Sequence, residues 1–358
     1  MNASKLKQIA FYLPQFYDFR ENNEFWGEGF TDWTNVRRAK PQFVGHRQPA
    51  TPLVGHYDFS NKEVLLGQMR VASTHSISAF CFYSYWFSGR RVMTKVFDHL
   101  IDSTNLPIDF CLCWANESWT RRWDGSQSEV LIPQNHDPLI DANFINDHIE
   151  ILSHKNYLKI NGKPLLLVYR SDILVDQRQT IQNFRKRAES LGLGEIHIAM
   201  VQTFGNFDPR PGGFDSAVQF PPHNIPAVGA QNIQSSNDFK GQIFDYESLI
   251  LNSLNNDMSF RTYRGVMPGW DNTPRRMNSA HVYHGVTKEN FKWWLRQQWQ
   301  SSINSAFPEE DVPLFINAWN EWGEGAQLEP GLNDDFDKLG AISEAFNEAT
   351  RFYSSEVK

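Results

Sequence analysis

The sequence has little of several features that would assign a protein to a class at once. No apolar run approaches the ~18 residues that a membrane-spanning helix needs. Basic residues are not in excess, because 34 lysines and arginines stand against 41 aspartates and glutamates, for a formal net charge of −7. A nucleic-acid-binding domain usually carries a basic excess. These absences argue against a membrane span and against a nucleic-acid partner.

Cysteine is scarce, and the N-terminus lacks a recognisable targeting segment. Cys81, Cys111 and Cys113 lie inside apolar runs, without a CxxC pair or an even count. We therefore expect buried thiols in a reducing compartment. Residues 1–8 are polar, and the apolar stretch after them stops at Pro14 without the length or the cleavage site of a signal peptide. These features predict a cytoplasmic protein.

Motifs for metal ions and nucleotide cofactors are also missing. The 11 histidines show no HExxH or other metal-ligand spacing. Neither GxGxxG nor GxxxxGK[ST] follows the first apolar run. The acidic stretch 333–335 lies in a polar connection, where a turn is a simpler interpretation than a metal site. We predict neither a metal site nor a cofactor.

Aromatic side chains, in contrast, are abundant. The chain has 27 Phe, 12 Trp and 11 Tyr residues, or 14% of the total. Apolar residues make up 41% and charged residues 21%, so the chain can bury a large core. Many tryptophans beside polar residues also suit a ligand that stacks, such as a sugar ring.

Short apolar runs alternate with longer helix-like segments along the chain. The runs predict strands near residues 8–13, 77–86, 108–114, 164–169, 196–202, 216–220, 262–267 and 313–319. The intervening segments predict helices near 60–75, 93–103, 138–155, 177–191, 288–304 and 337–352. Because the strands are continuously apolar rather than alternating, they favour a parallel sheet that is buried on both faces.

Eight such units predict an α/β fold, a single (β/α)8 TIM barrel with long βα loops. The alternative is a doubly wound open sheet, and the missing nucleotide-binding turn argues against it. No linker, repeat or low-complexity tract divides the chain, so we expect one catalytic domain over residues 1–358.

Polar and aromatic residues gather after the predicted strands. In TIM barrels the active site lies at these carboxyl ends. Indoles stack on pyranose rings, amides bond to hydroxyls, and paired carboxylates act on glycosidic bonds. For a single aromatic residue, packing is an equally good interpretation. The substrate-binding candidates are Trp26, Trp33, Asn35, Tyr83, Tyr85, Trp114, Asn116, Glu117, Trp119, Arg122, Trp123, Asp124, Gln202, Trp270, Asp271, Arg275, Asn320 and Trp322.

Two of these loops carry adjacent arginines, Arg121 with Arg122 and Arg275 with Arg276. They could bind a sulfate, phosphate or uronate group of an anionic glycan. They could equally neutralise nearby carboxylates or lie in solvent as loop charges.

The strongest local signal is the segment Asn-Glu-Trp-Gly-Glu-Gly at residues 320–325. Glu321 and Glu324 stand three apart with a glycine between them, which fits poorly with a solvated helical face. A turn could aim both inward, where close carboxylates separate their pKa values into one acid and one base. The other pairing is Glu117 with Glu321, each preceded by an asparagine, as in retaining β-glycosidases. Spacing alone does not choose between them.

Five motifs resemble those of the WbsX family, which is found in polysaccharide (O-antigen) gene clusters and is commonly labelled a glycosyltransferase. The resemblance covers the chain from about residue 8 to residue 352. The motifs lie at residues 11–16, 25–35, 111–124, 269–276 and 315–325.

The WbsX family is in turn similar to glycoside hydrolase family 99, endo-α-mannosidases and endo-α-mannanases that are (β/α)8 barrels. The motif of those hydrolases, Asn-Glu-Trp-His-Glu-Gly followed by Glu-Pro, falls on residues 320–325 and 329–330. Gly323 stands where the hydrolases have histidine, which leaves their mannose specificity open for this chain.

The resemblance implies that Glu321 is the base and Glu324 the acid/base. The base would deprotonate the 2-hydroxyl of the sugar, whose oxygen attacks the anomeric carbon and gives a 1,2-anhydro sugar. Water then opens the epoxide with net retention. This chemistry requires a 2-hydroxyl trans to the glycosidic bond, as in α-mannosides and α-rhamnosides, and neither a metal nor a nucleotide.

The sequence therefore predicts a retaining, endo-acting glycoside hydrolase of a bacterial polysaccharide or oligosaccharide, neutral or anionic. The alternative is a glycosyltransferase of O-antigen or other polysaccharide biosynthesis, whose expected two-Rossmann architecture is not visible. A third interpretation is a carbohydrate-binding barrel without catalysis. The presence of both Glu321 and Glu324 argues against it.

Overall fold

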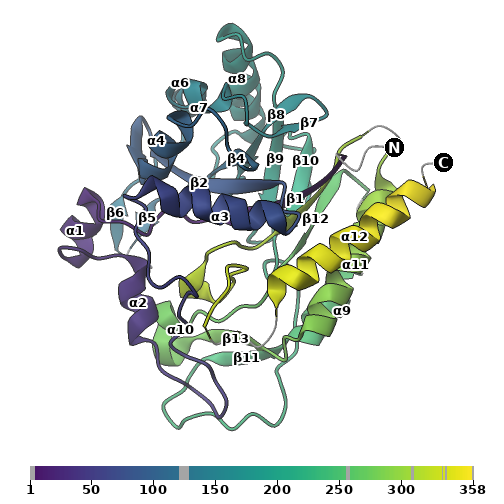
Figure 1. The fold of residues 1–358 in the computed structure, drawn as a ribbon. Helices are drawn as coiled ribbons and strands as arrows, with labels where there is room; N and C mark the ends of the chain where they lie inside the picture. Colours follow the sequence, from purple (N-terminus) through teal and green to yellow (C-terminus); the bar gives the residue numbers. More distant parts are fainter. Residues whose placement is uncertain are drawn as a thin grey trace.

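Eight parallel strands close into a barrel in the computed structural model, which describes residues 5–120, 129–254, 259–307, 310–332, 334 and 337–356 (Figure 1). The barrel strands are β1 (Leu6–Tyr12), β2 (Ala79–Phe87), β4 (Asp109–Trp114), β8 (Lys163–Val168), β9 (His197–Gln202), β10 (Ser216–Gln219), β12 (Thr262–Val266) and β14 (Val312–Ile316). Each strand pairs with the next one in this order.

The ring is closed by β1, which pairs with β2 on one side and with β14 on the other. Ile9, for example, is in register with Ala79 of β2 and with Phe315 of β14. The predicted TIM barrel is therefore confirmed. The alternative of an open sheet is wrong, because an open sheet would leave edge strands without a partner on one side.

The barrel strands are buried on both faces, as their continuous apolar character predicts. Every residue of β9, β10 and β14 is buried, and so are the three cysteines of β2 and β4. Cys81 of β2 lies in register with Cys111 of β4, and all three thiols are free. The expectation of buried, unpaired cysteines is confirmed.

Helices cover the outside of the barrel. They are α3 (Lys62–Thr74), α4 (Lys95–Ile101), α8 (Gln177–Ser190), α9 (Tyr246–Leu254), α11 (Lys288–Ser305) and α12 (Lys338–Glu356). Side chains at the N-terminal ends of several of these helices cap the first turn. The Asn61 side chain accepts a hydrogen bond from Glu63 N and caps α3. Thr287 and Asn290 form a reciprocal capping box at α11.

Three features of the helical layer differ from the sequence-based expectation. The helix expected over 138–155 is three short helices, α5 (Pro138–Asp141), α6 (Asn143–Asp147) and α7 (Ile149–Leu152). The last break falls at His148, whose buried ring bonds to Ser84 Oγ at 2.9 Å and to Phe144 O at 2.8 Å. Helix α9 was not expected, and the helix expected over 93–103 is the shorter α4, Lys95–Ile101.

The eighth strand ends at Ile316, earlier than the expected Trp319. Beyond the strand, Asn317 N still donates to Val266 O of β12 at 2.9 Å, and Trp319 N donates to Phe11 O of β1 at 2.7 Å. The backbone thus stays bonded to both neighbouring strands up to the turn that starts at Asn320.

The long loops add small elements of their own. The first loop carries α1 (Arg20–Trp26) and α2 (Asp32–Arg38). The others contain β3 (Arg90–Val92), the hairpin β5 (Trp119–Thr120) with β6 (Val130–Ile132), β7 (Lys159–Ile160), α10 (Thr273–Arg276) and the pair β11 (Gln242–Asp245) with β13 (His281–His284).

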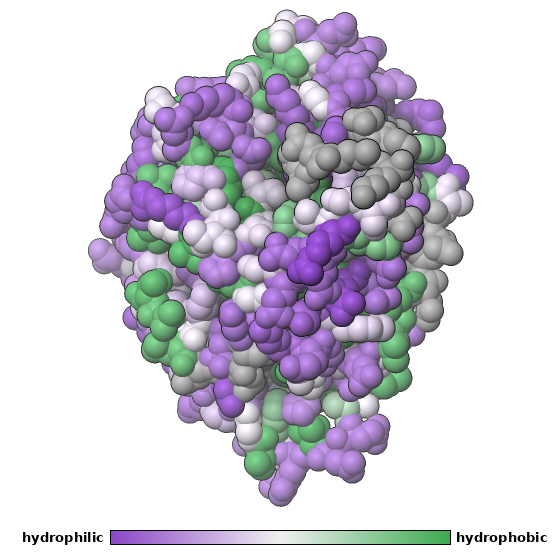
Figure 2. All heavy atoms as spheres, turned by 45° about the vertical axis from the view of Figure 1, so that its right-hand side comes forward, coloured by the Kyte–Doolittle hydropathy of each residue, from purple (hydrophilic) through white to green (hydrophobic). Residues whose placement is uncertain are grey.

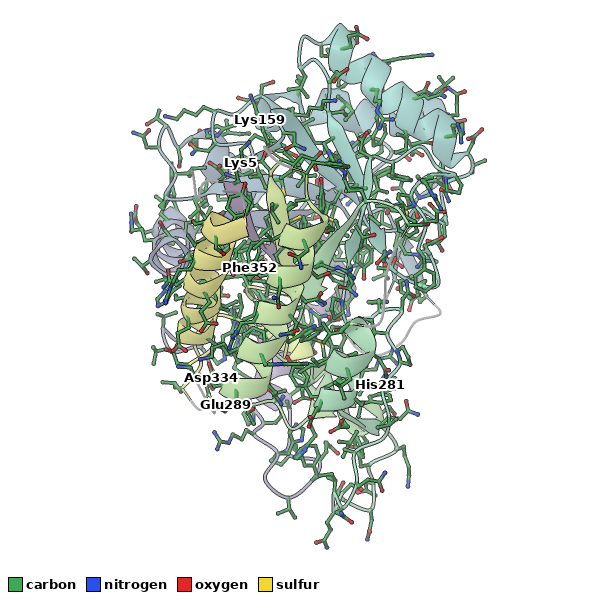
Figure 3. All side chains as sticks on the ribbon, turned by 90° about the vertical axis from the view of Figure 1, so that its right-hand side faces the viewer. Lys5, Lys159, His281, Glu289, Asp334 and Phe352 are labelled. Atoms are coloured by element: carbon green, nitrogen blue, oxygen red, sulfur yellow. The ribbon has the colours of Figure 1, made fainter. Side chains whose placement is uncertain are left out.

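Most of this loop structure lies at one end of the barrel. In Figure 3, Lys5, just before β1, lies in the upper half of the view, and His281 and Asp334 lie in the lower half. The face shown in Figure 2 is mainly hydrophilic, with apolar residues in separate patches. In the described part of the chain, no helix has the length and apolar character to cross a membrane.

Close packing of the barrel wall yields a first prediction. A Cβ at Gly265 in β12 would collide with Gln219 O of the neighbouring β10. We expect Gly265→Ala to lower the free energy of unfolding by about 1–3 kcal/mol, because the strands cannot separate without strain. Chemical denaturation measures the change.

The matched control is Gly67→Ala in α3, where a Cβ meets nothing within 4 Å. Alanine there should raise the free energy of unfolding by about 0.5–1 kcal/mol, because glycine is a poor helix former. Equal effects of the two substitutions would contradict the close approach of β10 and β12.

Candidate active site

A cavity of about 480 Å³ opens among the loops that follow the barrel strands. Its size is typical of a small-molecule pocket. Of the residues expected at the site, those that line it are Tyr83, Tyr85, Glu117, Trp119, Trp270, Arg275, Glu321 and Glu324. Tyr83 and Tyr85 lie near the end of β2, and the others come after β4, β12 or β14. The closed barrel therefore brings together residues as distant in sequence as Tyr83 and Glu324. Their roles toward a substrate stay predictions.

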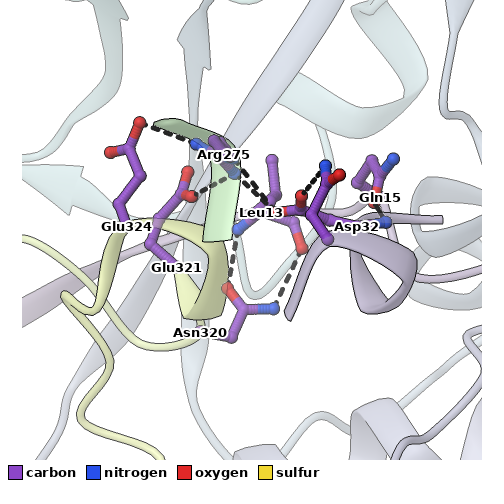
Figure 4. Close-up of polar contacts among 8 residues, drawn as sticks. Leu13, Gln15, Asp32, Arg275, Asn320, Glu321 and Glu324 are labelled. Carbon is purple, nitrogen blue, oxygen red and sulfur yellow. Dashed lines mark hydrogen bonds and ion pairs between the residues drawn. The ribbon is translucent and has the colours of Figure 1, made fainter. Parts of the chain in front are cut away.

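One guanidinium group organises the polar side of this cavity (Figure 4). Arg275 Nη1 donates to Glu324 Oε1 at 2.6 Å, and Arg275 Nη2 donates to Glu321 Oε2 at 2.9 Å. The same Nη2 also donates to Asp32 Oδ2 at 2.8 Å. The two glutamates therefore lie within the span of one side chain, held in fixed directions by charge-assisted hydrogen bonds.

Asp32 is the fully buried member of this cluster. Its N–H donates to Gln15 Oε1 at 2.9 Å, and its Oδ1 accepts from Asn35 Nδ2 at 2.9 Å. The second carboxylate oxygen faces Arg275. Sequence reasoning missed Asp32, although it stands in the motif at residues 25–35. The only available signal was an acidic residue in an otherwise aromatic loop.

The turn that carries both glutamates depends on glycine at two positions. Gly325 adopts φ 63°, and a Cβ there would collide with Asp271. At Gly323 a Cβ would overlap Asp32 Oδ2 and approach Arg275 Nε to 2.6 Å. The Asp32–Arg275 pair thus fills the space that a side chain at position 323 would need, which gives a physical reason for glycine there.

Asn320 fixes the start of this turn. Its Oδ1 accepts from Leu13 N at 2.8 Å, and its Nδ2 donates to Leu13 O at 2.9 Å. The side chain is fully buried. These hydrogen bonds tie the end of β14 to the end of β1, and Asn320 is not among the residues that line the cavity. Its contact with substrate stays a prediction.

Asn116, which follows β4, also bonds both of its side-chain polar atoms to the backbone of a neighbouring barrel segment. Its Oδ1 accepts from Arg170 N, and its Nδ2 donates to Arg170 O, both at 2.8 Å. Asn116 is also fully buried, and its contact with sugar hydroxyls likewise stays a prediction. Its neighbour Glu117 lines the cavity and accepts a bond from Arg170 Nη1 at 2.5 Å.

Burial dominates the electrostatics of Glu321. It raises the pKa of Glu321 to about 8, and the proximity of Arg275 lowers that pKa only in part. Glu324 and Asp32 add to the increase, since three carboxylates share one guanidinium. Glu324 is the more open of the pair, with 28% of its side chain exposed against 8% for Glu321. The two groups thus have different environments, as an acid and a base require.

A second buried carboxyl, that of Glu329, is hydrogen-bonded to the turn that carries Glu321 and Glu324. Trp322 Nε1 and Tyr57 OH each donate to Glu329 Oε2 at 2.8 Å, and Gln68 Nε2 donates to Glu329 Oε1 at 2.8 Å. Burial raises the pKa of Glu329 to about 7, while these three donors lower it. These hydrogen bonds fix the side chain of Trp322, which stands between Glu321 and Glu324 in the sequence.

Several aromatic residues expected to contact substrate belong to the core instead. Trp322 and Trp114 are fully buried, and the Trp114 ring packs against Phe144 at 5.3 Å, toward the helical layer. Trp33 stacks on Phe16 at 4.1 Å. None of the three indoles lines the cavity, so packing explains their positions, and their contact with substrate stays a prediction.

The remaining expected residues also lie away from the cavity wall. Trp26 packs behind Trp119, at 5.6 Å between ring centroids. Gln202 Nε2 donates to Phe207 O at 3.0 Å, and Asn35 is fully buried against Asp32. For these three, the predicted substrate contact is not supported, because neighbouring protein groups cover them.

Asp271 lies in an adjacent hollow of about 170 Å³, which Trp270 also lines. It accepts from His46 Nε2 at 2.7 Å and from Gln48 Nε2. Arg122, Trp123 and Asp124 lie outside the described residues.

Among the described residues, no group of histidine, cysteine, aspartate or glutamate is arranged to hold a metal ion. The cavity wall also includes Arg276, which the sequence offered as a binder of an anionic group. Other lining residues were not singled out by the sequence as binding residues: Phe87, Tyr169, Phe204, Phe220, His223 and His281.

Solved structures with the same architecture are glycoside hydrolases. The family 99 endo-α-mannosidase from Bacteroides thetaiotaomicron has a TM-score of 0.60 and 14% identity, covering 97% of this chain and 98% of that chain. A glycoside hydrolase-like protein has a TM-score of 0.61 and 14% identity, covering 95% and 93%. The likeness shows that this chain shares the (β/α)8 barrel fold of these proteins.

The chain belongs to the family described as Glycosyltransferase WbsX, whose model matches residues 8–342. Uncharacterized protein WxcX of Xanthomonas campestris pv. campestris (strain B100) is 41% identical over 345 residues. That match covers 95% of this chain and 50% of WxcX. A second strain has a WxcX protein with the same identity. The chain spans about half the length of the curated relatives it matches.

The raised pKa of Glu321 makes stability depend on pH. Folded Glu321 keeps its proton up to about pH 8, whereas the unfolded chain loses it near the ordinary value of 4.5. The stabilisation is thus complete below about pH 4.5 and is lost as pH rises through about 8. We expect Glu321→Gln to melt at a higher temperature than the wild type at pH 8 and at a similar temperature at pH 4.

The control for this experiment is Glu344→Gln. Lys288 and Lys292 lower the pKa of the surface residue Glu344 to about 2, so this variant should gain nothing at pH 8. A difference between Glu321→Gln and the wild type that is constant from pH 4 to pH 8, measured by thermal unfolding, would contradict the buried, protonated Glu321.

Proposed function

We propose that this chain is a retaining, endo-acting glycoside hydrolase. Its substrate is a bacterial polysaccharide or oligosaccharide with α-mannoside- or α-rhamnoside-like linkages. The observation that carries the proposal is the Glu321–Arg275–Glu324 arrangement in the wall of an aromatic cavity at the mouth of the barrel. Two carboxyls with different burial, aimed at one space, supply a base and an acid.

In the first step Glu321 is the base and Glu324 the acid. The Glu321 carboxylate takes the proton of the sugar 2-hydroxyl, and the freed oxygen forms a bond to the anomeric carbon. The bond from that carbon to the leaving oxygen breaks, and the leaving oxygen takes the proton of Glu324. The product is a 1,2-anhydro sugar.

In the second step the two carboxyls exchange roles. Glu324 takes a proton from water, whose oxygen attacks the anomeric carbon and opens the three-membered ring. Glu321 returns its proton to the sugar oxygen at position 2. Two inversions give net retention. The greater exposure of Glu324 suits the group that must meet both the leaving oxygen and the incoming water.

Arg275 positions both carboxyls. Its planar fork fixes the directions of Glu321 and Glu324, and Asp32 on the far side keeps the guanidinium in place. Because Arg275 already bonds to three carboxylates, it is a poor site for an anionic sugar group. On this rim Arg276, which is exposed and lines the cavity, is the better candidate for that contact.

A glycosyltransferase is the second candidate, since the family description names this activity. The test is a screen of the purified protein against oligosaccharides and nucleotide sugars, read by mass spectrometry. Cleavage with retention and without a nucleotide supports the hydrolase. Turnover that requires a nucleotide sugar would reject it in favour of the transferase.

The two glutamates should respond differently to the leaving group. With a glycosyl fluoride, protonation of the leaving group matters less, so Glu324→Gln should keep much more activity than Glu321→Gln. On an ordinary oligosaccharide both variants should lose about 10²–10⁴-fold in kcat/KM. A 2-deoxy substrate should not react, because it lacks the internal nucleophile.

The rival double displacement by Glu117 and Glu321 has other consequences. A 2-deoxy-2-fluoro sugar would then form a covalent adduct on one of these glutamates, detectable by mass spectrometry. Glu324→Gln would have little effect on any substrate. Either result would replace the 1,2-anhydro mechanism.

The pH dependence of kcat/KM tests which glutamate is the base. Burial raises the pKa of Glu321 to about 8 in the free protein, so a base at this position works only when pH approaches that value. We expect kcat/KM to rise with pH up to about 8. A profile that falls through the same pH would assign the acid role to Glu321.

A further inference from the structure

Phe204 stands out among the aromatic residues of the cavity because it is exposed. It lies in the turn after β9 and lines the cavity, yet 49% of its surface remains accessible. Tyr83, Trp119 and Phe220 of the same cavity are 7%, 6% and 3% exposed. Their burial is explained by packing, whereas the exposed ring of Phe204 needs another reason.

A guanidinium group covers one face of the ring. The Arg170 guanidinium stacks on Phe204 at 4.0 Å from the ring centroid. Arg170 is itself fixed by Glu117 at 2.5 Å and by Asp172 at 2.7 Å. His223 meets the ring in an edge orientation at 4.9 Å. This support keeps the ring in one orientation and leaves its accessible surface available to a ligand.

The backbone of this turn is held in an uncommon conformation. Phe204 has φ 48°, in a region that bulky residues rarely occupy. The turn is fixed from both sides: Thr203 Oγ1 donates to Tyr169 O at 2.9 Å, and Gly205 N donates to Asn224 Oδ1 at 2.7 Å. Because the Phe204 ring is half exposed, its burial offsets little of the energetic cost of this backbone conformation. The direction that the conformation gives to the ring is therefore the better explanation for it.

The position of Phe204 relative to Glu321 and Glu324 follows from the strand order. β9 lies three strands from β14 around the closed ring, and β8, which precedes Arg170, lies directly opposite β14. The Phe204 ring and the two glutamates therefore belong to different sides of the barrel mouth. A ligand that meets both must extend across the cavity.

We propose that Phe204 is a stacking platform for a sugar residue of the substrate other than the one that reacts at Glu321 and Glu324. This inference rests on the proposed function and deepens it, because it requires a substrate of at least two sugar residues. The apolar C–H face of a pyranose packs on the open surface of the ring. Arg170 and Glu117 act through Phe204 as positioning residues.

The test compares Phe204→Ala with two other variants. Phe204→Tyr keeps a ring for stacking. Phe207→Ala is the matched control, because Phe207 belongs to the same loop and is 40% exposed but lies outside the cavity lining. Each protein is assayed with an oligosaccharide and with a glycosyl fluoride of one sugar, and its melting temperature is recorded.

For Phe204→Ala we expect KM for the oligosaccharide to rise by about tenfold more than KM for the fluoride. Phe204→Tyr should restore the wild-type KM, and Phe207→Ala should match the wild type. Because the ring is half exposed, the melting temperature should stay within a few degrees. Equal changes for both substrates, or a lower melting temperature with unchanged KM, would overturn the proposal.

Failure of the proposed function gives a separate result. If the wild type cleaves neither substrate, the hydrolase is rejected, and calorimetry of oligosaccharide binding to the wild type and to Phe204→Ala then tests the platform alone. Weaker binding by Phe204→Ala supports the stacking platform. Equal binding, or none to the wild type, overturns it.

Discussion

The site is organised by the ion pairs of a single arginine with three carboxylates. Arg275 joins α2, through Asp32, to the turn after β14, through Glu321 and Glu324. Removing the guanidinium would leave buried carboxylates without a counter-charge, which is far more costly than losing a surface ion pair. Glycine at position 323 follows from the same arrangement, because the Asp32–Arg275 pair occupies the space of any side chain there.

Buried hydrogen bonds also connect the cavity glutamates to the barrel wall. The asparagine before each cavity glutamate bonds both its oxygen and its nitrogen to backbone of an adjacent barrel segment, Asn320 to Leu13 and Asn116 to Arg170. Each pair of bonds fixes the direction in which the following glutamate leaves its strand. The repeated Asn-Glu pattern is thus a positioning device shared by the two sides of the cavity.

The two sides differ in chemistry in a way that suits an extended ligand. The β14 side carries Glu324 and Glu321, and burial raises the pKa of Glu321. The β8–β9 side carries Phe204 on a fixed guanidinium. The proposed function would place a sugar chain between these two sides.

The sequence by itself determined the barrel and the buried cysteines. Both depend on local pattern, since continuous apolar runs form parallel strands that are buried on both faces. For the catalytic pair, spacing left Glu321 with Glu324 and Glu321 with Glu117 equally open, and only the family resemblance favoured the former. Only the tertiary structure decided which aromatic residues face the cavity. Trp114 turned into the core and Phe204 stayed open, because the direction of a side chain at a strand end depends on neighbours distant in sequence. The same holds for Asp32, whose place beside Arg275 exists only once the barrel has closed.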